Sequence, residues 1–151
     1  KFSVECVENL AARFPKNIIG VKDSSYNLMG NLNIKNFSIL PGSELKLLSG
    51  LKKDCSGIIT ATCNVTAKLA RKVFDDFEQN IDQTVNDKLC EVRKAFDQFN
   101  LISGLHSFLS LTDKQFLNIL PTCSLLSKQD EKTLIDKLKD LNFLEKDFKA
   151  A

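Results

Sequence analysis

The sequence has 151 residues, of which 43% are hydrophobic and 26% charged, and its 21 basic and 19 acidic side chains give a formal net charge of +2. This composition is typical of one globular unit. Basic and acidic residues are intermixed, so no field of one sign could hold a nucleic acid or an anionic membrane. No apolar run approaches the roughly 20 residues of a membrane-spanning helix. The first residues lack a signal-peptide pattern, and we expect a cytoplasmic protein.

The cysteines and the single histidine provide no recognisable site. Five cysteines are dispersed without a C-x-x-C pair or a zinc-type cluster, which favours reduced, mostly buried thiols over disulfides or a metal centre. Nothing in the sequence brings a cysteine near His106, the only histidine, so a Cys–His nucleophile is disfavoured. We therefore expect neither a metal nor a cofactor.

The first half of the chain alternates helical and extended patterns. Residues 3–14 carry apolar side chains at helical spacing, with Ser3 as N-cap and Pro15 ending the helix. Three short apolar runs predict buried strands at 17–22, 37–41 and 55–62. The segments after them predict a short helix that starts at Asp23 and ends near 31–36, and helices at 45–51 and 65–79. Such alternation predicts parallel strands joined by right-handed crossovers, an α/β fold.

The second half is helical. Apolar residues at alternating steps of four and three over 85–99 predict a helix with a narrow apolar seam. Further helices are predicted at 101–111, 112–120 and from Ser127 onward. We expect two parts, βα units over 1–80 and a helical region over 81–151 that packs on the first part or forms a subunit contact.

Lys22 is the residue whose position indicates chemistry. It ends an apolar strand, and the carboxyl ends of parallel strands are where α/β folds place their active sites. An ammonium among isoleucine and valine side chains is poorly solvated, which favours the free amine that can attack a ketone and form a Schiff base. The alternatives that remain open are a lysine whose charged end reaches solvent and a structural ion pair with Asp23.

The residues around Lys22 resemble a known family. The segment 18–25, Ile-Ile-Gly-Val-Lys-Asp-Ser-Ser, resembles the Schiff-base lysine segment of the dihydrodipicolinate synthase and N-acetylneuraminate lyase family of pyruvate-dependent class I aldolases. Residues 39–44 and 56–64 resemble the next strand with its glycine turn and the last-strand motif of that family. Phrases at 101–109 and 120–127 resemble its C-terminal helices. The motifs occur in the family's order and cover essentially the whole chain.

The resemblance implies a fold and a reaction. Family members are (β/α)8 TIM barrels, and this chain is similar to their C-terminal part, about strands 6–8, followed by a helical extension. It implies that Lys22 forms an imine with pyruvate or another 2-oxo acid, which adds to or is released from an aldehyde. A homo-oligomer is also implied.

The resemblance also assigns binding residues by position. Gly42, Ser43 and Glu44 would line the aldehyde side of the site, and Ile59 would pack on the pyruvyl group. Thr60 stands where the family commonly has serine. Ala61 carries no hydroxyl where sialic-acid lyases usually have serine, which disfavours a sialate substrate.

Two features of the family are not matched in this sequence. Its proton-relay tyrosine lies in a Tyr-Asn-x-Pro phrase that would fall before Lys1, and Tyr26 does not match it. The hydroxyl loop that holds the 2-oxo acid carboxylate would lie further upstream. We therefore expect a piece of a longer polypeptide, or a half-barrel that needs its other half, with little turnover by itself. The alternative is a non-catalytic binding or scaffold half-barrel, and the aldehyde stays open.

Overall fold

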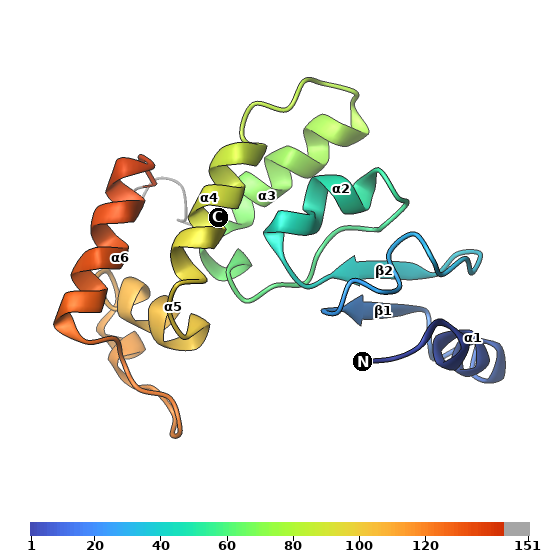
Figure 1. Ribbon diagram of the computed structural model, residues 1–151, viewed down its shortest axis with the longest axis horizontal. Coiled ribbons are helices and arrows are strands. Elements are labelled where there is room, and N and C mark those ends of the chain that lie inside the picture. Colours follow the sequence, from blue (N-terminus) through green and yellow to red (C-terminus); the bar gives the residue numbers. More distant parts are fainter. Residues whose placement is uncertain (144–151) are drawn as a thin grey trace. The chain divides into compact units, whose positions relative to one another are not determined.

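In the computed structural model, which describes residues 1–143, the chain forms two compact units. The first comprises residues 1–60 and 72–84, and the second comprises residues 61–71 and the residues from 85 onward. The division falls within one long helix, α3 (Cys63–Glu78), drawn in green in Figure 1. The sequence-based boundary near residue 80 stays a prediction.

Two parallel strands form the centre of the first unit. Strand β1 (Gly20–Asp23) pairs with β2 (Ser38–Pro41), with Lys22 opposite Leu40. A Cβ atom on Gly20 would lie 2.8 Å from the carbonyl oxygen of Ser38, so this close pairing requires a glycine. The parallel direction predicted from the alternating pattern is confirmed.

Helix α1 (Val4–Arg13) precedes the sheet and matches its predicted bounds closely. The hydroxyl of Ser3 accepts a hydrogen bond from the Cys6 amide at 3.1 Å, as the predicted N-cap should. The predicted apolar face is buried at Val7 and Ala11, but Phe14 at its end is exposed. This helix contributes to an apolar cluster with the sheet and the loops, whose buried members are Val7, Leu28, Leu32, Ile39 and Cys55.

The short helix predicted after Asp23 is absent, because the chain between β1 and β2 forms turns. Tyr26 adopts a φ of 56°, in the left-handed region that interrupts a right-handed helix. The Asp23 carboxylate accepts from the amides of Ser25, Leu28 and Met29 at 2.9 to 3.2 Å. The last two lie too far along the chain for a helix N-cap, so this side chain organises a loop instead.

The prediction of a regular strand at 55–62 is also wrong, because no strand forms there. The amide of Ser56 donates to the carbonyl of Ile39, and the amide of Ile59 donates to that of Pro41, both at 3.0 Å. Three residues on this segment therefore span two on β2, which is the count of a β-bulge. Gly57, at φ 137°, supplies a backbone conformation that side chains rarely permit. The segment follows β2 without forming a continuous ladder.

A short helical stretch follows β2. It consists of a 3-10 turn, η1 (Glu44–Lys46), and helix α2 (Leu47–Leu51), which together confirm the helix predicted at 45–51. The Ser43 hydroxyl accepts from the Leu45 amide at 3.3 Å and caps the turn. The turn at residues 42–44 is thereby held close to the carboxyl end of β2.

The second unit contains the helices of the second half and the first part of α3. They are α4 (Asn86–Phe96), α5 (Leu101–Leu109), the 3-10 turn η2 (Lys114–Leu117) and α6 (Lys128–Asp140). The helix predicted at 112–120 is therefore only a 3-10 turn. Phe96 meets Phe108 edge to face at 5.7 Å between ring centroids. Helix α6 packs against α4 and α5, and the end of the predicted region, 144–151, lies outside the described residues.

The loop after β1 gives a first prediction. Replacing Asp23 by alanine leaves the amides of Leu28 and Met29 without their acceptor, and we expect this to lower the free energy of unfolding by about 2 kcal/mol or more. Asp23→Asn, which keeps one acceptor oxygen, should have a smaller effect. Urea unfolding of both variants measures this, with the exposed Glu8→Ala as control. Equal stability of Asp23→Ala and Glu8→Ala would contradict it.

The buried thiol of Cys55 gives a second prediction. Burial raises its pKa, and the negative charges of Asp23 and Asp54 raise it further. Because the folded state holds this proton more tightly than the unfolded state, the contribution to stability is complete below about pH 8.5 and is lost as the pH rises through the raised pKa. Urea unfolding between pH 7 and 10 should show a steeper loss for the unmodified chain than for Cys55→Ala. Cys6→Ala, at a half-buried cysteine on α1, should retain the steeper loss; equal slopes for all three proteins would refute it.

Candidate functional site

Lys22 lies near the carboxyl end of β1 and is exposed. It lines a pocket of about 330 Å³, together with Lys1, Phe2, Asp23, Ser24, Ser25 and Leu28. The expectation that Lys22 is poorly solvated is not met by the residues described. Within residues 1–143 its ammonium also has no ion-pair partner. The amine is therefore accessible to a small molecule that enters this pocket.

The ion pair between Lys22 and Asp23, one of the alternatives from the sequence, is not formed. Asp23 is 2% exposed, and its carboxylate is occupied by the loop that follows. One oxygen accepts from the amide and the hydroxyl of Ser25, both at 3.2 Å, and the other from the amides of Leu28 and Met29. The carboxylate is satisfied without a cation, and it fixes the wall of the Lys22 pocket.

Gly42 brings the turn after β2 against the loop after β1. Its amide donates to the carbonyl of Asp23 at 3.2 Å. A Cβ atom at this position would lie 2.7 Å from the Ser24 hydroxyl oxygen and 3.3 Å from the Ser24 Cα. Glycine is favoured here because the Ser24 backbone approaches closely, which is one of the usual reasons for a glycine beside a binding site.

Ser43 and Glu44 lie inside the first unit. Ser43 is 3% exposed and caps η1, and Glu44 is fully buried. A carboxylate oxygen of Glu44 accepts a hydrogen bond from the Thr60 hydroxyl at 3.0 Å. Both side chains are thus engaged with the protein itself, and their contact with an aldehyde stays a prediction.

Ile59 and Thr60 follow the bulge in the segment beside β2. The amide of Ile59 bonds to Pro41, while its side chain is 48% exposed and available to a ligand. Thr60 is half-buried and bonded to Glu44. These hydrogen bonds join the segment to β2 and to its turn, just as the Gly42 amide joins that turn to the end of β1.

The six residues predicted from the sequence therefore come from three neighbouring backbone segments at one end of the sheet. Sequence reasoning missed the roles of Asp23, Ser24 and Ser25, which line the Lys22 pocket. It took them for the start of a helix, although polar residues just after a buried parallel strand are themselves a signal of a binding loop.

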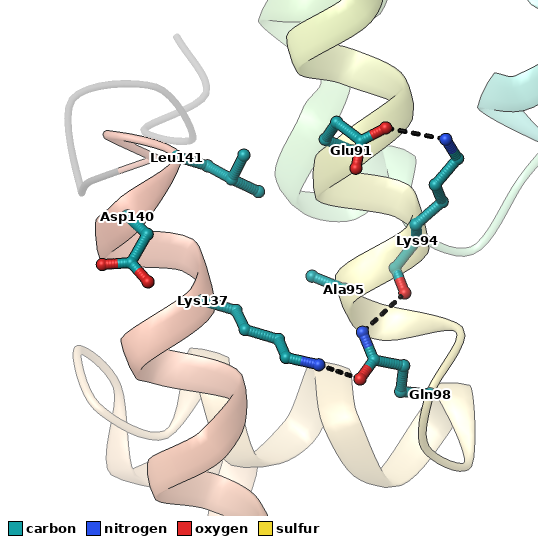
Figure 2. Close-up of a pocket in the computed structure, with 7 residues that line it drawn as sticks. All are labelled: Glu91, Lys94, Ala95, Gln98, Lys137, Asp140 and Leu141. Atoms are coloured by element: carbon teal, nitrogen blue, oxygen red, sulfur yellow. Dashed lines mark hydrogen bonds and ion pairs between the residues drawn. The ribbon is translucent and has the colours of Figure 1, made fainter.

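A second pocket, of about 280 Å³, lies between α4 and α6 in the second unit (Figure 2). Four of its polar side chains are engaged in pairs: Lys94 pairs with Glu91 at 2.7 Å, and the Lys137 ammonium donates to the Gln98 amide oxygen. Glu91 and Lys94 are about half exposed, where an ion pair is worth little. None of the predicted site residues lies in this groove.

Within residues 1–143, the histidine and the cysteines form no metal site. The imidazole Nδ1 of His106 lies 2.9 Å from the carbonyl oxygen of Phe116 and its ring contacts that phenyl ring, both within the second unit. Among the described residues, no three histidine, cysteine, aspartate or glutamate side chains gather where they could hold a metal ion. Within the same residues, no helix combines the length and hydropathy needed to cross a membrane.

The fold matches solved structures of dihydrodipicolinate synthases. The enzyme of Cyanidioschyzon merolae, crystallised with lysine bound, matches with a TM-score of 0.80 at 14% identity, over 94% of this chain and 50% of its own. The enzyme of Thermotoga maritima matches with a TM-score of 0.77 at 18% identity, over 93% of this chain and 51% of its own. The enzyme of Agrobacterium tumefaciens matches with a TM-score of 0.66 at 21% identity, over 92% of this chain and 48% of its own. The chain spans about half the length of these enzymes.

No curated protein matches the chain. The sequence model of the dihydrodipicolinate synthetase family matches residues 1–141, nearly its whole length. The same stretch contains the lysine strand, the glycine turn and the bulged segment described above. The chain therefore belongs to the dihydrodipicolinate synthetase family.

Proposed function

We propose that this chain supplies the Schiff-base lysine of a class I aldolase or lyase acting on pyruvate or a related 2-oxo acid, and that it corresponds to about strands 6–8 of the barrel with the C-terminal helices. The observation that carries the proposal is a pair of backbone hydrogen bonds: the Gly42 amide donates to the Asp23 carbonyl, and the Ile59 amide donates to the Pro41 carbonyl. It places an accessible amine, a glycine turn and an exposed apolar side chain on adjacent segments. Pyruvate has a ketone that an amine can attack and a methyl group that an apolar side chain can contact.

The neutral amine of Lys22 attacks C2 of the 2-oxo acid, and the ketone oxygen leaves as water after proton transfer, which gives an iminium. The iminium accepts the electron pair released when a proton is lost from C3, and the enamine forms. In the direction of synthesis, C3 of the enamine attacks the aldehyde carbon, and water then releases the product and the amine. Cleavage is the reverse. We propose that the groups moving these protons lie outside the 151 residues.

In this scheme Ile59 packs on the pyruvyl group of the 2-oxo acid, and Gly42 lines the aldehyde side. Ser43 and Glu44 set the shape of the aldehyde side, and the Thr60 hydroxyl, bonded to Glu44, keeps the bulged segment against the turn. The identity of the aldehyde is not assigned beyond a carbonyl that the enamine can attack. Assembly into a homo-oligomer is part of the same proposal, since the family resemblance implies it.

One observation favours the second candidate, a non-catalytic binding half-barrel. Lys22 is exposed, whereas a Schiff-base lysine works best where its charged form is poorly solvated. In that case the pocket beside β1 binds without forming a covalent bond. The two candidates differ in whether Lys22 can be trapped with a ketone.

The experiment is reductive trapping. Incubation with pyruvate and borohydride should convert Lys22 to its carboxyethyl derivative, located by peptide mass spectrometry, in clear excess over the other lysines. Lys22→Ala should abolish this label and alter the free energy of unfolding by less than about 0.5 kcal/mol, because the side chain is exposed. Lys16→Ala, at another exposed lysine, should keep the label. Equal labelling of Lys16 and Lys22 would point to non-specific chemistry and favour the non-catalytic candidate.

Turnover is a separate expectation. Imine formation needs the amine, but aldol addition also needs a group that moves the proton at C3. We expect the 151-residue chain to be trapped by borohydride and yet to show no aldol product in a coupled assay with pyruvate and an aldehyde. Measurable turnover that is lost in Lys22→Ala would show that the chain contains its own proton relay.

A further inference from the structure

Tyr26 has a strained backbone conformation, because its φ of 56° lies in the left-handed region. The other non-glycine residues with positive φ in the described part of the chain are asparagines and an aspartate: Asn36, Asp54, Asn80 and Asn142. Their short polar side chains can hydrogen-bond locally, which makes this conformation tolerable. A tyrosine has no such compensation. Strain of this kind persists only where the surrounding structure imposes it, and it is common at binding sites.

The loop around Tyr26 imposes this conformation. The buried carboxylate of Asp23 accepts hydrogen bonds from the amide of Ser25 on one side of the tyrosine and from the amide of Leu28 on the other. These bonds fix the path of the backbone through Tyr26, which directly follows a residue that lines the Lys22 pocket. The position of the tyrosine at this end of the sheet is therefore set by the loop.

The ring of Tyr26 contacts the ammonium of Lys46. The Lys46 Nζ lies 5.3 Å from the ring centroid, within the range of a cation–π interaction. Lys46 is the last residue of the turn η1 after β2, and both side chains are half-buried. The hydrogen bond from the Gly42 amide to the Asp23 carbonyl joins the same two loops through their backbones. Two loops that follow neighbouring parallel strands thus hold one lysine ammonium between them.

The Lys46 ammonium has no ion-pair partner within residues 1–143. Glu44, two residues earlier, is fully buried and accepts a hydrogen bond from the Thr60 hydroxyl. An ammonium has three N–H donors, and the face of a ring engages its charge without replacing a hydrogen-bond acceptor. A carboxylate would supply acceptors and the single negative charge that one ammonium balances, whereas a phosphate group carries nearly two charges.

We propose that Lys46, held against the ring of Tyr26, binds the carboxylate of a small organic acid. The ammonium supplies the charge and the N–H donors, and the ring keeps the ammonium in one position, which lowers the entropy lost on binding. The site binds without a covalent bond and does not need the Lys22 amine, so it goes beyond the Schiff-base chemistry. That the acid held there is a substrate of the Lys22 reaction rests on the proposed function.

Tyr26 is itself the probe for the test, because the chain has one tyrosine and no tryptophan. Propionate has a carboxylate but no ketone, so it cannot form an imine. Titration with propionate at constant ionic strength should change the tyrosine fluorescence and reach saturation, whereas neutral propionamide should have no effect. Lys46→Ala should weaken the apparent affinity by about tenfold or more, and Lys46→Arg should retain it. The absence of a saturable response, or an equal response to inorganic phosphate, would overturn the proposal.

Three further variants separate the contributions. Tyr26→Gly adopts the left-handed conformation without strain, so its urea midpoint should stay close to that of the unmodified chain, while its propionate affinity, followed by the NMR shift of the Lys46 amide, should fall severalfold. An unchanged affinity would overturn the role of the ring. Lys35→Ala, at an exposed lysine, and Lys22→Ala should both retain binding. Failure of Schiff-base trapping therefore leaves this result intact, whereas loss of propionate binding in Lys22→Ala would refute the assignment to Lys46.

Discussion

The buried carboxylate of Asp23 is the interaction on which the first unit depends. Its side chain gathers the loop after β1 by accepting two pairs of hydrogen bonds, and its backbone carbonyl accepts the amide of Gly42 from the turn after β2. One residue thus fixes two loops at the same end of the sheet. A buried charge is costly unless its hydrogen bonds are satisfied, so this arrangement is strongly specified.

That constraint explains why the backbone around the candidate site is well defined. The turn at Gly42 and the bulged segment at Ile59 are held in order by backbone hydrogen bonds, and Glu44 is secured to Thr60 inside the unit. Lys22, by contrast, is exposed, and among the described residues its strand pairs with β2 alone. Hydrogen bonds hold the scaffold of the site, while an apolar environment for the amine is not supplied by the described residues.

The match to solved enzymes is also partial, because it covers about half of each of them. This chain aligns along nearly all of its length with about half of each synthase, and family membership rests on a sequence model that covers residues 1–141. The proposed chemistry belongs to a complete site, so it depends on what lies against β1.

Local patterns in the sequence determined a great deal. Apolar spacing predicted helices α1, α4 and α6. The N-caps Ser3 of α1 and Ser127 of α6 were also predicted, because helix ends are set by neighbouring side chains and backbone amides. Alternation of strands and helices predicted the parallel sheet, and the motif order indicated the family that the sequence model confirms. Lys22 at the end of its strand followed from the same patterns.

Only the tertiary structure decided the loop after β1, the bulge beside β2 and the exposure of Lys22. The sequence predicts Asp23 as a helix cap, yet its carboxylate accepts hydrogen bonds from amides five and six residues further along the chain. Leu28, one of these two residues, packs in the apolar core. The segment at 55–62 has a strand's composition, but one extra residue against β2 interrupts its ladder. Solvent exposure depends on which elements surround a side chain, and no local pattern around Lys22 contains that information.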